Sequence, residues 1–275
     1  MPSNTSANSG NTPGNQQLGA AFAGRSVIVT GGSRGIGRVI AQQFLDAGAQ
    51  VTICGRNAPD DLPQSNGQQA VFVEADVREP DDIDRVVEAT ITATGRLDVL
   101  INNAGGSPHV MAADASARFV ASIISLNLTS ALVFSQRANA VMQQQDFGGA
   151  IVNVSSVSGL RPSPGTAAYG AAKAGLNSAT QSLAVEWAPK VRINSVSAGL
   201  IATENAQDHY GGAAGMAAVA ATVPLGRFGT PADVAGACLF LASPQASYIS
   251  GANLVVNGGD QWPAFLTAAS AFTSH

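Results

Sequence analysis

The sequence predicts an α/β fold, a doubly wound parallel sheet with helices on both faces, in a single domain. Short apolar runs alternate with longer helical patterns between residues 25 and 260. Most of the short runs are rich in Val and Ile and carry few charges, which is typical of parallel strands buried on both faces. The order strand, helix, strand repeats along the chain, and no linker, repeat or change of composition divides it.

The apolar runs predict seven strands, at residues 26–30, 50–54, 70–74, 97–102, 150–155, 191–196 and 253–256. Helices are predicted between them at 36–47, 81–94, 115–145, 167–187 and 231–241. The second helix has a clear start, because Pro80 stands near its first position and acidic residues fill its first turn. We interpret those acids as a helix start rather than a metal site. Residues 55–69 contain two prolines and no apolar period, so a loop is predicted there.

The composition describes a globular chain, because 45% of its residues are hydrophobic and only 12% are charged. The net charge of −4 comes with no basic stripe, which argues against nucleic acid and against anionic membranes as partners. No run reaches the ~18 apolar residues of a membrane-spanning helix. Cys54 and Cys238 stand in apolar runs, so we expect buried thiols rather than a disulfide framework.

The two ends of the chain differ from the domain predicted over residues 21–260. Residues 1–20 have neither the positive nor the apolar region of a secretory signal. They are rich in Asn, Ser, Gly and Thr, and we predict a disordered tail there. Residues 261–275 form a C-terminal extension that is apolar enough to dock on a neighbouring subunit. A cytoplasmic location is expected.

A glycine-rich turn follows the first predicted strand and leads into a helix. It reads Thr30-Gly31-Gly32-Ser33-Arg34-Gly35-Ile36-Gly37. Free N–H groups and the dipole at a helix N-terminus attract anions, and residues without side chains let a pyrophosphate approach the backbone. The spacing G-x-x-x-G-x-G differs from the commoner G-x-G-x-x-G, and flexible turns are also rich in glycine. The position between strand and helix favours a dinucleotide site in a Rossmann-like fold.

Two arginines indicate which dinucleotide binds. Enzymes that prefer NAD place an acidic residue after the second strand, whereas here Gly55-Arg56 follows it and Arg34 stands in the glycine turn. Two guanidiniums suit a 2′-phosphate, so NADP(H) is expected, with NAD(H) possible. Two alternatives stay open. Both arginines could be solvated surface residues, or Asp60 or Asp61 could bind the ribose and select NAD(H).

Several motifs together resemble the short-chain dehydrogenase/reductase family over about residues 25–260. They are the glycine turn, Asn102-Asn103-Ala104-Gly105 after the fourth strand, and Tyr169-x-x-x-Lys173 on a helix. Further matches follow in order: Asp76-Val77, Asn127 in SLNLTS, Ser156 thirteen residues before Tyr169, and Ile201 and Thr203 in AGLIAT. The family usually has Pro-Gly where this chain has Ala198-Gly199, so the backbone there should be less restrained.

The resemblance implies a role for each matching residue. Tyr169 would be the catalytic acid and base, with Lys173, Ser156 and Asn127 completing the site. Residues implied in cofactor binding are Gly31, Ser33, Arg34, Gly35, Ile36, Gly37, Arg56, Asp76, Val77, Asn103, Ala104, Gly105, Tyr169, Lys173, Gly199, Ile201 and Thr203. His109 and His209 have no metal-ligand companion at a suitable spacing, so no metal is expected, although both could line the substrate mouth.

The residue types suit hydride transfer at a carbinol carbon. Tyrosine has a pKa of ~10 in model peptides and is a poor base at neutral pH. Lys173 lies one helical turn from Tyr169, so we expect its ammonium, together with an oxidised nicotinamide, to lower the pKa of the phenol. Ser156 would hydrogen-bond the substrate oxygen. By resemblance, Asn127 would hold a water that links Lys173 to solvent.

The expected function is therefore an oxidoreductase acting on a secondary alcohol or ketone. One alternative is a 3-oxoacyl-thioester reductase using coenzyme A or a carrier protein. Gln181 and Val185 argue against the carrier protein, because they stand where carrier-protein reductases present basic residues. An alternative of another class is a non-catalytic NADP-binding regulator, which the intact catalytic set argues against.

The substrate and the assembly are predicted from small and apolar residues. Residues 201–224 are mostly small and should cover the pocket, which Met216, Leu160, Arg161, Tyr210 and residues 107–110 would also line. A non-ionic, fairly hydrophobic substrate is expected. The two long middle helices carry few charges on any face, as helices buried in interfaces do, and a homotetramer is expected.

Overall fold

The computed structural model describes residues 22–204, 206, 210–263, 265 and 269, and it has the predicted doubly wound α/β fold. The predicted tail at residues 1–20 lies outside the described residues, as does most of the extension at 261–275. Within the described residues, seven strands form one sheet in the order β5-β2-β1-β6-β7-β8-β9. Every ladder of this sheet is parallel, so the carboxyl ends of all its strands meet at one edge.

The strands match the predicted ranges to within two residues at either end. They are β1 (Ser26–Thr30), β2 (Gln50–Gly55), β5 (Val71–Glu74), β6 (Val99–Asn102), β7 (Gly149–Ser156), β8 (Val191–Ala198) and β9 (Asn253–Val256). β1, β6 and most of β7 and β8 are buried along their length, as their apolar sequences predicted. The strand order reverses between β1 and β6, and such a switch point opens a crevice for ligands at the carboxyl edge.

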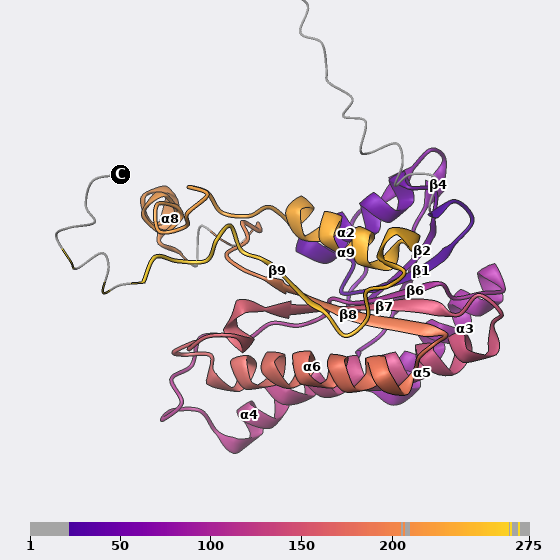
Figure 1. The fold of residues 1–275 in the computed structure, drawn as a ribbon, viewed down its shortest axis with the longest axis horizontal. Helices are drawn as coiled ribbons and strands as arrows, with labels where there is room; N and C mark the ends of the chain where they lie inside the picture. Colours follow the sequence, from indigo (N-terminus) through magenta and orange to yellow (C-terminus); the bar gives the residue numbers. More distant parts are fainter. Residues whose placement is uncertain (1–21, 205, 207–209, 264, 266–268, 270–275) are drawn as a thin grey trace, which may run out of the picture.

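Two layers of helices cover the sheet (Figure 1). One face carries α2 (Gly35–Asp46) and α9 (Pro231–Ala242), and the other carries α3 (Pro80–Thr94), α5 (Ser130–Gln144) and α6 (Ala167–Glu186). Each layer buries its own apolar cluster. Phe22 packs edge-to-face on Phe44 in the first, with ring centroids 4.9 Å apart, and Phe134 and Met142 are buried in the second. Burial of these clusters is the main favourable term that holds the layers on the sheet.

The long helix predicted at 115–145 is interrupted. It consists of α4 (Ala117–Ile124), a π-helical segment (Ser125–Thr129) and α5. Ser116 caps the start, because its hydroxyl accepts the Phe119 N–H at 3.1 Å. The π segment is centred on Asn127, whose side-chain amide donates to the Ile123 carbonyl at 2.9 Å. Such bulges are frequent at functional sites, and helical periodicity alone does not reveal them.

The loop predicted at 55–69 contains a small hairpin in place of a helix. β3 (Gln64–Ser65) and β4 (Gln68–Gln69) pair antiparallel across Asn66 and Gly67. Both turn residues have positive φ, 51° and 79°, as a type I′ turn requires. The Asn-Gly pair is the local signal for this hairpin, which the sequence analysis did not predict.

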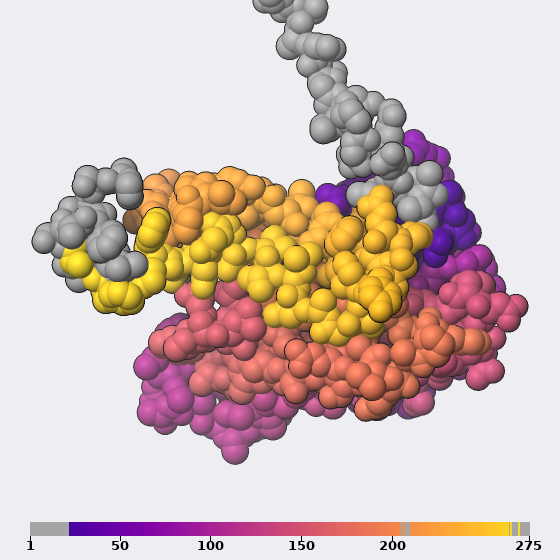
Figure 2. Space-filling model, viewed as in Figure 1, coloured from indigo at the N-terminus to yellow at the C-terminus, as the bar shows by residue number. Residues whose placement is uncertain are grey.

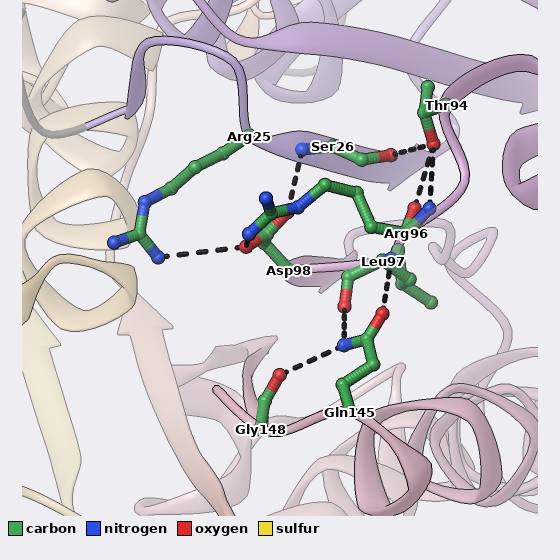
Figure 3. A network of polar contacts seen from close by, with 8 residues as sticks. All are labelled: Arg25, Ser26, Thr94, Arg96, Leu97, Asp98, Gln145 and Gly148. Carbon is green, nitrogen blue, oxygen red and sulfur yellow. Dashed lines mark hydrogen bonds and ion pairs between the residues drawn. The ribbon is translucent and has the colours of Figure 1, made fainter.

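The amino ends of the strands are tied together by a polar network (Figure 3). Asp98 is 2% exposed and accepts the backbone N–H of Ser26 at 2.9 Å, which joins the start of β1 to the start of β6. Arg96 donates two hydrogen bonds to the same carboxylate, and the Arg25 guanidinium lies 3.7 Å from it. The Gln145 side chain bonds both backbone groups of Leu97. This network holds the edge opposite the carboxyl ends.

Three expectations from composition can be compared with the described residues. Cys54 and Cys238 are free and buried, as expected, and burial raises the pKa of each thiol to about 12. No cluster of potential metal ligands occurs among the described residues. By length and composition, the run Ala117–Gln144 alone among the described helices passes the test for a membrane-crossing helix, a test that core helices also pass. Here it packs on α6 and the sheet.

Candidate active site

The predicted catalytic residues come from three elements and meet at the carboxyl edge of the sheet. Ser156 is the last residue of β7, Tyr169 and Lys173 lie on the first turns of α6, and Asn127 lies in the π segment. The parallel strands and the switch of strand order place these residues beside the glycine turn that follows β1.

Lys173 is buried beneath Tyr169. Its side chain is 3% exposed, and Nζ donates a hydrogen bond to the Val154 carbonyl at 2.8 Å. Nζ lies 5.6 Å from the centroid of the Tyr169 ring. Burial lowers the pKa of Lys173 from 10.5 to about 8, because a low-dielectric surrounding disfavours the ammonium. The lysine is therefore still mainly protonated at neutral pH.

The Tyr169 phenol differs from the expectation. Burial raises its pKa above the ordinary value of 10.0, and a hydrogen bond with Ser156 offsets only part of that rise. The predicted lowering by Lys173 is thus not found in the protein without cofactor, where the ammonium bonds the Val154 carbonyl. Tyr169 is consequently a neutral proton donor at physiological pH. The Ser156 hydroxyl accepts the Ser158 N–H at 3.1 Å, which leaves its own proton for a partner.

Asn127 fixes the backbone of the loop that follows β6. Its Oδ1 accepts the N–H of Gly106 at 2.8 Å, and its Nδ2 donates to the Gly106 carbonyl at 2.9 Å. A Cβ built on Gly105 would lie 2.7 Å from Asn127 Oδ1 and 3.4 Å from Lys173 Nζ. Only glycine fits there, so Gly105 brings the loop backbone close to both residues. Sequence reasoning missed Gly106, because its contact is made across 21 residues.

The glycine turn and the loop after β6 are bonded to each other. Gly31 has a φ of +65°, and a Cβ on Gly37 would lie 2.3 Å from the Gly31 carbonyl oxygen. Thr30 Oγ1 accepts the N–H groups of both Asn103 and Ala104 at 2.9 Å. Thr30 was not among the predicted site residues. Its hydroxyl joins two segments that are 73 residues apart, and nothing in a local motif signals that contact.

The turn fits a pyrophosphate. No acidic residue occupies the first turn of α2, and its N-cap residue Arg34 makes no side-chain cap hydrogen bond. The N–H groups of that turn, including those of Ile36 and Gly37, are therefore available to an anion. Ser33 Oγ is buried and has no hydrogen-bond partner among the described residues. A buried unpaired hydroxyl is costly, and a ligand oxygen would satisfy it.

The two predicted arginines lie at the ends of the first two strands. Arg56 lines a pocket of about 450 Å³ with Val73, Glu74, Ala75, Asp76, Asp82 and Arg85. Neither Arg34 nor Arg56 has a salt-bridge partner among the described residues. The Arg78 guanidinium holds the pKa of Asp76 below its ordinary value, since it bonds that carboxylate. Val77 is buried beside it.

The remaining predicted cofactor residues follow β8. Ala198 pairs with Ser156 on one side and with Val256 on the other, so the two ladders restrain the backbone where the family has proline. A Cβ on Gly199 would lie 2.7 Å from the Asn257 Cα, which explains the glycine. Ile201 bridges to Gly229 beyond it.

Thr203 lies near the start of α2, and the next residue was missed by sequence reasoning. The Glu204 carboxylate accepts the backbone N–H of Gly35 at 3.3 Å, across 169 residues. Sequence spacing gave no signal for this contact, because it depends on how the segment after β8 folds over the glycine turn.

Three segments flank the predicted substrate side. Arg161, just after β7, bonds Gln261 at 2.7 Å and lies 3.5 Å from Asp260. The Tyr210 ring contacts Phe228 with centroids 5.1 Å apart. Residues 201–224 include α8 (Gly212–Ala220), which extends with the C-terminal segment beyond the main body (Figure 2). His109 packs against Gly165, and His209 lies outside the described residues.

Comparison with known proteins agrees with this geometry. Residues 31–260 match the sequence profile of a family described as enoyl-(acyl carrier protein) reductase. The L-rhamnose 1-dehydrogenase (NAD(P)(+)) of Azotobacter vinelandii is 38% identical over 246 residues, which cover 86% of this chain and 96% of the relative. A 3-oxoacyl-(acyl-carrier-protein) reductase of Chlamydia muridarum is 37% identical over 257 residues, covering 88% and 99%.

A solved structure is similar over the same region. The ligand-free aldohexose dehydrogenase of Thermoplasma acidophilum superposes with a TM-score of 0.81 at 31% identity, over 88% of this chain and 95% of that one. The relatives are named for different substrates, whereas the match to each spans nearly the whole length of both chains. The matched region contains the glycine turn, the π segment with Asn127 and the Ser156, Tyr169 and Lys173 site, and the chain belongs to the short-chain dehydrogenase/reductase family of oxidoreductases.

Proposed function

We propose that this protein transfers a hydride between NADP(H) and a secondary alcohol or ketone, with Tyr169 as the catalytic acid and base. The observation that carries the proposal is the buried arrangement of Tyr169 on Ser156 with Lys173 beneath its ring. It lies at the carboxyl edge beside an anion-binding turn. A non-catalytic NADP-binding regulator would have no need to bury a lysine and a tyrosine in this arrangement.

Each residue has a chemical task in the proposed reaction. A bound nicotinamide supplies the hydride to the carbonyl carbon or accepts it from the alcohol. Tyr169 donates its proton to the substrate oxygen in reduction, for which its raised pKa keeps it protonated. Ser156 donates a hydrogen bond to the same oxygen as charge develops there. The Lys173 ammonium stabilises the phenolate that remains, and it is the same charge that favours proton removal by Tyr169 in oxidation.

NADP(H) is the proposed cofactor because two guanidiniums lie where the 2′-phosphate would be. Arg34 and Arg56 are exposed and have no salt-bridge partner among residues 22–204, 206 and 210–263. The competing reading, in which Asp61 binds the ribose, is disfavoured by its contacts. Arg38 bonds Asp61 at its carboxylate, 2.5 Å away, and at its carbonyl, one helical turn along α2 from Arg34.

Titration of both cofactors into wild type and Arg56→Ala tests this assignment. Wild type should bind NADPH roughly ten- to a thousandfold more tightly than NADH, since charge-assisted hydrogen bonds are strong but solvent screens exposed ones. The variant should lose roughly tenfold or more in NADPH affinity and keep its NADH affinity, which serves as the internal control. Equal or tighter binding of NADH by wild type would make NAD(H) the natural cofactor.

A 3-oxoacyl thioester is the second candidate substrate. The Chlamydia muridarum relative is named for that reaction on a carrier protein. Gln181 and Val185 on α6 are exposed and uncharged, which favours a coenzyme A ester over an acidic carrier. The small residues of α8 and the half-exposed Leu160 support a fairly hydrophobic, non-ionic substrate. A turnover panel of ketones, sterols and 3-oxoacyl-CoA esters with NADPH distinguishes these classes.

We also propose a homotetramer. Val185 on α6 is 81% exposed, and Leu254 and Val255 of the edge strand β9 are 37% and 41% exposed. The helical run Ala117–Gln144 is strongly apolar, and only 28% of its most apolar window is buried within one chain. Large exposed apolar faces mark surfaces that a partner covers, and further copies of the chain are the partner proposed here.

A further inference from the structure

The carboxylate of Glu204 lies where the glycine turn would receive a diphosphate. Its Oε1 accepts the N–H of Gly35, the first residue of α2, at 3.3 Å. A Cβ built on Gly35 would lie 3.7 Å from Glu204 Oε2 and 3.9 Å from Thr203 Cγ2. Two consecutive residues from the segment after β8 therefore lie on the start of α2.

The start of α2 offers more to an anion than Glu204 uses. The helix has no acidic residue in its first turn and no side-chain cap, so its dipole and free N–H groups attract a negative group. Glu204 accepts one of those N–H groups. Ser33 Oγ, in the same turn, stays buried without a hydrogen-bond partner among the described residues. A diphosphate has more acceptor oxygens than a carboxylate and could satisfy both.

The segment that carries Glu204 is anchored on one side only up to Ala202. The Ala202 N–H donates to the Gly229 carbonyl at 2.8 Å, and Ile201 bridges to the same residue. Downstream, Gly211 and Gly212 have φ values of +79° and +76° before α8 begins. The contact at Gly35 can therefore break without disturbing the sheet, and the movement would pass to Thr203.

We propose that Glu204 is a built-in competitor for the cofactor diphosphate. In the free protein it occupies the start of α2, and an arriving diphosphate displaces it because two anions repel each other there. Displacement frees Thr203 and the segment leading to α8, so the arrangement of the substrate loop is linked to cofactor occupancy. This inference rests on the proposed function only in that a dinucleotide binds at the glycine turn.

Binding calorimetry at low salt tests the competition directly. NADPH and ADP are titrated into wild type, Glu204→Gln and Glu88→Gln; ADP carries the diphosphate without the nicotinamide. Glu88 is exposed on α3, so its variant makes the same change of net charge away from the turn. Glu204→Gln should lower both dissociation constants about two- to fivefold, the strength of a carboxylate at a helix N-terminus. Glu88→Gln should leave them unchanged.

Hydrogen–deuterium exchange gives a second readout that needs no turnover. In residues 201–206, Glu204→Gln without ligand should exchange as fast as wild type does with NADPH bound. If wild type binds NADPH while Glu204→Gln binds it equally or more weakly, Glu204 is not a competitor and the inference is wrong. If wild type binds neither NADPH nor NADH, the proposed function itself fails, and this inference fails with it.

Discussion

At the scale of single residues, the burial of Lys173 makes the stability of the protein depend on pH. Its pKa is about 8 in the folded protein and 10.5 when the chain is unfolded. Between these values the unfolded chain binds one more proton than the folded protein, so the free energy of unfolding rises with pH. The full window corresponds to about 3 kcal/mol, at 1.36 kcal/mol per pKa unit.

Lys173→Met, which cannot titrate, should remove this contribution. The stability of wild type relative to Lys173→Met should increase by about 2 kcal/mol between pH 7.5 and 9.5. Urea unfolding of both proteins at the two pH values measures it. The pKa of Tyr169 is raised above 10.0, so that residue does not titrate in either state over this range. A stability difference that stays constant with pH would show that Lys173 keeps an ordinary pKa.

A second residue supports the opposite edge of the sheet. Asp98→Ala should lower the free energy of unfolding by about 2–3 kcal/mol, because it leaves the buried Ser26 N–H without an acceptor and separates two arginines from their carboxylate. Asp98→Asn should cost less, since its carbonyl oxygen still accepts from Ser26. Urea unfolding at pH 7 measures both, with the exposed Asp146→Ala as the control. A loss for Asp98→Ala no larger than the control's would contradict the role of the network in Figure 3.

At the scale of elements, the strands were predictable and the details of the site were not. Burial on both faces makes strands such as β1 and β6 read as apolar runs, and the sequence therefore predicted their positions. The Tyr169 and Lys173 pair was equally visible, since residues four apart share a face of α6.

The features that sequence reasoning missed are contacts across long separations or departures from regular helix. The π segment changes the helical period at Asn127, and amphipathic spacing does not report it. Thr30 acts through the loop 73 residues away, and Glu204 through Gly35. Each is a polar side chain of ordinary sequence context, and only the folded arrangement shows what it bonds. The direction of the Tyr169 pKa also depended on burial, which the spacing to Lys173 did not include.

At the scale of the whole molecule, assembly is the prediction most open to a direct measurement. Light scattering at micromolar protein should give the mass of four chains, because the exposed apolar residues of α6 and β9 would otherwise face water. Val185→Glu should weaken the assembly, since it places a charge in an apolar interface. A monomeric mass for wild type would contradict the proposal, and deletion of residues 1–20 should leave the mass of the assembly unchanged apart from the deleted segments.

The central claim is that Tyr169 exchanges the proton with the substrate oxygen while the rest of the site binds the cofactor. The most direct test compares wild type with Tyr169→Phe, measuring NADPH binding by titration and NADPH oxidation on the best ketone of the panel across pH. Tyr169→Phe should keep NADPH affinity within about twofold and lose at least about a thousandfold in turnover, because only the ionisable hydroxyl is removed. Near-normal turnover by Tyr169→Phe at any pH would contradict the account.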